Sequence, residues 1–99
     1  MTAIIDPKLG KAIKRLKSED RLVHAAFTLK NAQNGQFLSP ERTGMIVNQI
    51  VDRAAKKTDR KPGRVVVFKN MQSFSIDAPA SLIEELTHED HISTAALGS

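Results

Sequence analysis

Residues 21–30 alternate between apolar and polar positions with the period of two that a half-buried β-strand requires. The positions expected to face the core are Val23, Ala25, Phe27 and Leu29. Residues 39–57 then follow the helical period, with Ser39 as the N-cap and Pro40 in the first turn. The apolar stripe of this helix comprises Ile46, Val47, Ile50, Val51 and Ala54. The pattern therefore predicts a strand followed by a long amphipathic helix.

Residues 63–97 continue as strand, tight turn, strand, proline-started helix and strand. The apolar run within residues 64–69 is typical of a central strand that is buried on both faces. Residues 73–78 alternate again and are expected to pair antiparallel with that strand. Pro79 opens the next helix, and residues 92–97 return as the last strand. This order predicts an α+β fold, a ferredoxin-like βαββαβ split sandwich with a four-stranded antiparallel sheet and two helices.

Residues 1–20 predict an additional amphipathic helix that begins at Asp6 and Pro7. Its apolar stripe comprises Leu9, Ala12, Ile13 and Leu16, and its basic residues are Lys8, Lys11, Lys14, Arg15 and Lys17. The stripe is expected to dock either on the domain's own surface or on a partner, and both alternatives stay open. The predicted organisation is a basic N-terminal helix at 1–20, one domain at 21–97, and a remnant of a longer chain at 98–99.

The charge is unevenly distributed along the chain, whose net charge is +4. Residues 1–62 carry 13 Lys or Arg and 6 Asp or Glu, whereas residues 63–99 carry 2 and 5. This asymmetry either guides a partner to one face or reflects solvated helix surfaces. The N-terminus lacks the continuous apolar stretch of a signal peptide, and no segment reaches the roughly 20 apolar residues of a membrane span. A cytoplasmic protein without membrane contact is therefore predicted.

Residues that could carry out catalysis or hold a cofactor are few. The chain has no cysteine, which excludes disulfides, thiolate metal sites and a cysteine nucleophile. The one cluster of metal-ligand side chains comprises Glu84, Glu85, His88, Glu89, Asp90 and His91. At the end of a short surface helix such residues are usually solvated, so no metal site is predicted. No serine lies in a nucleophile-elbow pattern and the five glycines form no phosphate-binding loop, so we expect neither an enzyme nor a cofactor.

Several short motifs follow one another in a specific order along residues 21–97. They are a first strand that ends in Thr28-Leu29-Lys30, a Gly63 that opens Arg64-Val65-Val66, an aromatic-x-apolar third strand at Phe74-Ser75-Ile76, a helix start at Ala78-Pro79 with Leu82 and Leu86 beyond it, and the charged turn His88-Glu89-Asp90-His91 followed by Ile92. In this order and spacing the chain resembles the propeptide-like inhibitors of subtilisin-type serine proteases, the family of subtilase prodomains and their free-standing relatives.

The resemblance implies a domain that lays the exposed face of its sheet on the protease, while the chain after the last strand enters the active-site cleft. Main-chain pairing in the cleft is strand addition, in which side-chain pockets set the selectivity. The implied partner-binding residues are His24, Ala26, Arg64, Val66, Phe68, Ser75 and Asp77 on the sheet, and Thr94, Ala95, Ala96 and Leu97 in the last strand and tail. The implied function is inhibition, or assisted folding, of a subtilisin-like serine protease.

Two other functions stay open. Many prodomains carry acidic residues after the last strand, whereas this chain has Ala96, Leu97 and Gly98, which favours a domain repurposed as an adaptor or oligomerisation module of a larger protein. The βαββαβ order also occurs in RNA-recognition domains, but these stack bases on aromatic side chains, and this chain has no tyrosine or tryptophan. We therefore expect a protein partner, and the composition argues against nucleic acid.

Overall fold

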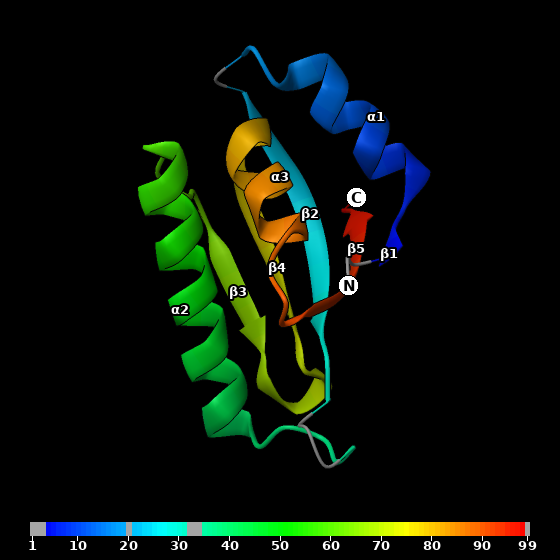
Figure 1. The fold of residues 1–99 in the computed structure, drawn as a ribbon, viewed down its shortest axis with the longest axis vertical. Helices are drawn as coiled ribbons and strands as arrows, with labels where there is room; N and C mark the ends of the chain where they lie inside the picture. The colour runs from blue at the N-terminus through cyan, green and yellow to red at the C-terminus, as the bar shows by residue number, and fades with distance from the viewer. Residues whose placement is uncertain (1–3, 20, 32–34, 99) are drawn as a thin grey trace.

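The computed structural model describes residues 4–19, 21–31 and 35–98, which form an α+β fold with a five-stranded mixed sheet (Figure 1). The strands are β1 (Ile4–Ile5), β2 (Leu22–Leu29), β3 (Val65–Phe68), β4 (Ser73–Pro79) and β5 (Ile92–Leu97). The helices are α1 (Pro7–Leu16), α2 (Pro40–Thr58) and α3 (Ala80–Thr87), and the short 3-10 turn η1 (Lys69–Met71) joins β3 to β4. The three helices cover one face of the sheet and leave the other face open (Figure 1). The predicted turn at 31–36 lies partly, and Ser99 wholly, outside the described residues.

The strand order is β1-β5-β2-β4-β3, which corrects the predicted four-stranded antiparallel sheet. β2 pairs antiparallel with β4 and β5, and β3 pairs antiparallel with β4 as the sequence predicts. The fifth strand is β1, which pairs parallel to β5 with Ile4 opposite Thr94. Two residues are too few to show an alternating pattern, so a strand this short leaves no periodic signal in the sequence. The sheet is therefore mixed rather than wholly antiparallel.

β3 lies at an edge of the sheet, so the prediction of a central strand buried on both faces is wrong. Val65, Val66 and Val67 are only partly buried, and Phe68 is 45% exposed. The run is apolar because Val65 and Val67 pack against the core on the helix side while Val66 and Phe68 face the open side. An apolar run predicts that both faces of a strand carry apolar side chains, but it does not predict whether the strand has a neighbour on each side or lies at the edge of the sheet.

α1 docks on the domain's own surface, which decides between the two alternatives that the sequence left open. The Asp6 side chain caps the helix by accepting a hydrogen bond of 3.2 Å from the Lys8 N–H. Leu9 and Ile13 belong to the main hydrophobic core, where α1 packs against α3 and β5. Lys17, just after the helix, forms an ion pair of 2.8 Å with Glu84 of α3. Together with β1, the N-terminal segment is therefore part of the same packed unit.

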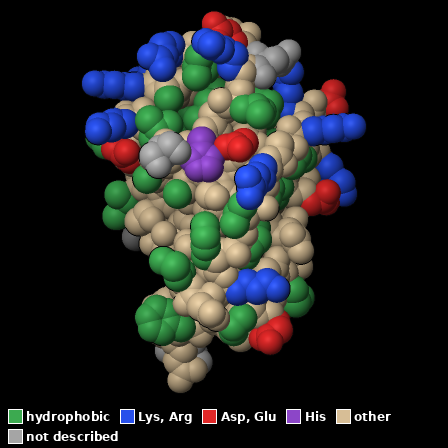
Figure 2. Space-filling model, turned by 180° about the vertical axis from the view of Figure 1, so that it is seen from behind, with side chains coloured by type: hydrophobic (Ala, Val, Ile, Leu, Met, Phe, Trp, Pro, Cys, Tyr) green, Lys and Arg blue, Asp and Glu red, His purple; other side chains and the backbone are tan. Residues whose placement is uncertain are grey.

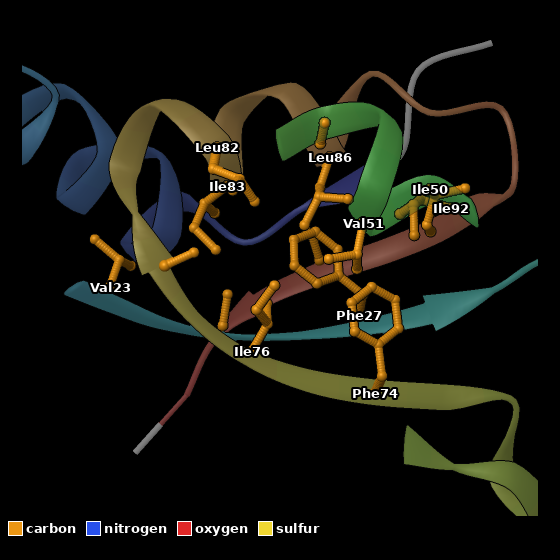
Figure 3. Close-up of a cluster of buried hydrophobic side chains, with 14 of the residues drawn as sticks. Val23, Phe27, Ile50, Val51, Phe74, Ile76, Leu82, Ile83, Leu86 and Ile92 are labelled. Atoms are coloured by element: carbon orange, nitrogen blue, oxygen red, sulfur yellow. The ribbon is translucent and has the colours of Figure 1, made fainter. Parts of the chain in front are cut away.

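The core lies between the sheet and the helices, where side chains of α2 and α3 meet the inner face of β2 and β4 (Figure 3). Phe27 and Phe74 are opposite each other in the ladder, and their rings stack with centroids 5.1 Å apart. Both rings are almost completely buried. The apolar stripe predicted for residues 39–57 is buried in α2, with Ser39 as the observed N-cap. No described helix is both long and apolar enough to cross a membrane.

Two irregular positions fix how the strands are aligned. Leu29 is opposite Ile92 and Thr28 is opposite Thr94, so Ser93 is an extra residue that forms a bulge in β5. Gln72 has a left-handed backbone with φ of 50° and is 5% exposed. Its side-chain oxygen accepts a hydrogen bond from the Leu38 N–H, and its side-chain nitrogen donates to the Asn31 side chain at 3.1 Å. Gln72 thereby joins the η1 turn to the segments at both ends of the loop between β2 and α2.

Candidate protein-binding face

The sheet surface opposite the helices is the candidate site, and we call it the open face (Figure 2). Its side chains come from all five strands and from Arg64 just before β3: Ile4, Thr94, Ala96, Leu22, His24, Ala26, Thr28, Ser73, Ser75, Asp77, Arg64, Val66 and Phe68. Strand alternation produces this surface, because residues two apart share a face and the other set faces the core. All of these side chains are exposed or partly exposed.

The middle of the open face is built from small side chains arranged in rows across the strands. One row runs Ala96, Ala26, Ser75 and Val66, and the next runs Ile4, Thr94, Thr28, Ser73 and Phe68. The second row is closed at both ends by a large apolar side chain, since Ile4 is 75% exposed and Phe68 is 45% exposed. The result is a shallow floor of alanine, serine and threonine with apolar residues at its two edges.

A third row of the open face contains the ionisable side chains of His24 and Asp77. His24 and Asp77 are opposite each other, and the His24 Nδ1 is hydrogen-bonded to the Asp77 carboxylate. The two residues form a non-hydrogen-bonded pair of the ladder, because the backbone groups of Asp77 bond to Gly63 and Arg64 just before β3 and the carbonyl of His24 bonds to Gly98. Side chains of such pairs lie closest together, which explains the contact. A histidine touches an acidic side chain in the upper half of Figure 2.

Gly98 continues the pairing of β5 with β2 and lies beside the imidazole ring. Its N–H donates a hydrogen bond of 2.8 Å to the His24 carbonyl, which extends the ladder one residue beyond β5. A Cβ at this position would lie 1.9 Å from His24 Cδ2 and 2.7 Å from His24 Nε2. The absence of a side chain at Gly98 therefore gives the imidazole its place next to Asp77.

Most of the partner-binding residues predicted from the sequence come together on the open face. These are His24, Ala26, Arg64, Val66, Phe68, Ser75, Asp77, Thr94 and Ala96. Ala95 and Leu97 are the exceptions. Ala95 is 2% exposed and belongs to the core. The bulge at Ser93 shifts the alternation of β5, so Ile92 and Ala95 both face inward. Leu97 is opposite Ala25 and therefore lies on the helix side of the strand, at 39% exposure.

Sequence reasoning missed several members of the open face. Leu22, Thr28 and Ser73 share the alternation of the residues that it selected, so their positions carried a usable signal. Ile4 carried no such signal, because β1 has only two residues. The pairing of His24 with Asp77 depends on the register between β2 and β4, which joins residues 53 positions apart.

Three acidic residues of the cluster near the end of α3, Glu84, Glu85 and Glu89, form ion pairs. Glu85 pairs with Lys57 at 3.3 Å, and Glu89, which is 8% exposed, pairs with Arg53 at 2.9 Å. Within the described ranges, no group of three or more His, Cys, Asp or Glu side chains is arranged to hold a metal ion. Through Glu85 and Glu89, these ion pairs connect the end of α3 and the turn after it to α2.

The open face is suited to contact with another macromolecule. Its floor has no side chain larger than threonine, so a partner helix or sheet can approach the backbone closely. Phe68 is the aromatic residue on this face among the described residues, which leaves it without the several stacking platforms of RNA-binding sheets. No protein-family model, no curated protein and no solved structure matches the chain.

Proposed function

We propose that this chain is a protein-binding domain that lays its open face on a subtilisin-like serine protease and acts as its inhibitor or as a folding assistant. The observation that carries the proposal is the floor of small side chains between Ile4 and Phe68, which offers a close-packing surface for partner helices. The order of motifs that resembles subtilase prodomains supplies the identity of the partner. In this proposal β2 to β5, with α2 and α3, act as a ferredoxin-like split sandwich to which β1 and α1 are added.

The proposal assigns different roles to the parts of the open face. Ala26 lies in the central strand β2 at the middle of the floor, where it would be covered most completely by a partner. Val66 and Phe68 would add apolar area at one edge, and the His24–Asp77 pair would add polar contacts beside it. β5 is next to β2, so Gly98 at the end of the described chain lies beside the proposed docking surface.

Titration of a subtilisin-type protease with the purified protein tests the proposal. We expect stoichiometric loss of protease activity, with slow cleavage of the domain near residues 95–99. Ala26→Glu buries an unpaired carboxylate in the proposed interface and is expected to weaken inhibition by at least about tenfold. Gln49→Glu, on the exposed side of α2, is the matched control because it adds the same charge away from the open face. Rapid degradation of the domain without inhibition of several such proteases would contradict the proposal.

A second candidate is an adaptor that uses the same face for a partner other than a protease. The observation that favours it is the sequence Ala96, Leu97 and Gly98 at the end of β5, which supplies no carboxylate where many prodomains carry acidic residues. An adaptor binds through the open face and does not present a substrate-like tail. It therefore predicts that Ala26→Glu abolishes partner capture while proteases are neither inhibited nor bound. Self-association measured by sedimentation would assign the face to oligomerisation.

A further inference from the structure

The free edge of β3 carries backbone groups that point away from the sheet. The Asp77 N–H donates to the Arg64 carbonyl at 2.9 Å, and the Gly63 N–H donates to the Asp77 carbonyl at 2.6 Å. Antiparallel ladders alternate between bonded and non-bonded pairs, so the backbone groups of Val66 and Phe68 face β4. Those of Val65 and Val67 face outward, where no described strand lies. This edge therefore offers two N–H and two C=O groups to a further strand.

An apolar groove runs beside this edge on the helix side. It has a volume of about 220 Å³ and lies between α2, the chain before β3 and the start of β3. Its lining residues are Val47, Asn48, Val51, Asp52, Ala55, Pro62 and Val65. A strand added to β3 would send alternate side chains to the helix side of the sheet, directly into this groove. The groove therefore selects apolar residues at every second position of an added strand.

Basic residues stand at both ends of the edge. Lys61 and Arg64 precede β3 and Lys69 follows it, and all three are exposed. None of them forms an ion pair with any described residue, whereas the nearby Asp52 is paired with Lys56 at 3.0 Å. Pairing with a second copy of this chain is disfavoured, because the symmetric antiparallel register centred on Val66 places Arg64 opposite Phe68 and Lys69 opposite Gly63, which gathers basic residues of both copies at each end with no acidic partner between them. The charges match a segment with acidic residues at its ends.

We propose that β3 takes up an extended segment of another protein as a sixth strand of the sheet, with apolar residues at alternate positions and acidic residues at both ends. Backbone hydrogen bonds to Val65 and Val67 hold the segment, and the groove beside α2 takes its inward side chains. Arg64 and Lys69 fix its ends and exclude basic segments. This site is the edge of the sheet, and it shares Arg64 with the open face but does not use the small side chains at the middle of that face.

A labelled peptide tests this site by fluorescence anisotropy. The probe is the seven-residue peptide Asp-Val-Thr-Val-Thr-Val-Glu, with a fluorescein group at one end. The matched control peptide has lysine in place of both acidic residues, and a second control has proline in place of the central valine. We expect the acidic probe to bind more tightly than either control, with the preference over the lysine peptide decreasing as salt is raised.

Two variants of the protein separate the backbone contribution from the charge contribution. Val67→Pro removes an outward N–H that no described residue accepts, so the pairing of β3 with β4 is kept while binding weakens about tenfold. The double substitution Arg64→Glu and Lys69→Glu is expected to reverse the preference in favour of the lysine peptide. This reversal remains a test if Val67→Pro fails to fold, because the charge variant keeps the strand sequence Val65–Phe68.

Amide signals in solution NMR locate the binding. We expect the peptide to protect the Val65 and Val67 amides from hydrogen exchange and to leave those of Thr94 and Ala96 unchanged. Protection of the open face or of β5 alone would overturn the proposal. A concentration-dependent dimer in the absence of peptide, with the same two amides protected, would assign the edge to a second copy. Equal binding of acidic and lysine peptides would overturn the proposed charge recognition.

Discussion

Gly98 lies under the His24 imidazole, so Gly98→Ala tests whether the position of that ring depends on the missing side chain. The added Cβ would lie 1.9 Å from His24 Cδ2 and 2.9 Å from His24 Cγ, both far inside van der Waals contact. Gly98 does not have a positive φ, so the backbone itself accommodates alanine. The ring must therefore move, and its hydrogen bond to Asp77 must break.

The size of the effect follows from the exposure of the pair. The His24 and Asp77 side chains are 43% and 31% exposed, so their contact contributes at most about 1 kcal/mol to the free energy of unfolding. We expect Gly98→Ala to lower that free energy by about 1 kcal/mol when His24 is present. In a His24→Ala background the Cβ meets no ring, and the same substitution is expected to be neutral within about 0.5 kcal/mol.

Urea unfolding followed by far-ultraviolet circular dichroism measures all four proteins of this double-mutant cycle. The chain has no tryptophan or tyrosine, so the dichroism of the backbone is the suitable signal. A coupling free energy of about 1 kcal/mol between the two positions supports the reasoning. An equal loss of stability from Gly98→Ala in both backgrounds would refute it, because the cost would then not come from the imidazole.

Three further substitutions test the packing with the same unfolding assay. Gln72→Ala removes the side chain that accepts a hydrogen bond from the Leu38 N–H and donates one to Asn31, and we expect it to lower the free energy of unfolding by about 2 kcal/mol. A decrease below about 0.5 kcal/mol would contradict the inference that Gln72 holds these segments together. Thr43→Val replaces a buried hydroxyl that has no hydrogen-bond partner among the described residues, and we expect it to raise the free energy of unfolding by about 1 kcal/mol. A decrease instead would show that the hydroxyl has a partner. Gly10→Ala adds a Cβ within α1 that has no atom within 4 Å, and we expect it to raise the free energy of unfolding by about 0.5–1 kcal/mol relative to wild type. A decrease would show that the native helix does not tolerate a side chain at this position.

Local periodicity was sufficient to predict most elements of this fold. The helix start at Ser39 and Pro40 was correct because a cap and an initiating proline act within one turn. The last strand was predicted at residues 92–97 and is observed there. The side chains that β2 contributes to the open face could likewise be chosen from alternation, which places His24 and Ala26 on the same surface.

What the sequence could not supply depends on contacts between distant segments. The edge position of β3 follows from the order of strands, and an apolar run does not encode that order. The sequence assigned Ala95 to the binding residues of the last strand and tail, whereas alternation after the bulge at Ser93 turns its side chain into the core. Gln72 adopts a left-handed backbone although glycine and asparagine are the usual residues there, and only its three-dimensional hydrogen bonds explain the choice.

The central position of β2 has a consequence for how the chain is made. Both neighbours of β2, which are β4 and β5, come later in the sequence, and the pairing of His24 with Asp77 spans 53 residues. At ribosomal rates of about 5–20 residues per second, roughly 3–10 s separate the synthesis of these partners. β1 waits longest, because its partner β5 is the last described strand to be made. A nascent chain that stops before Ile92 therefore holds β1 without a partner and β2 paired on one side only.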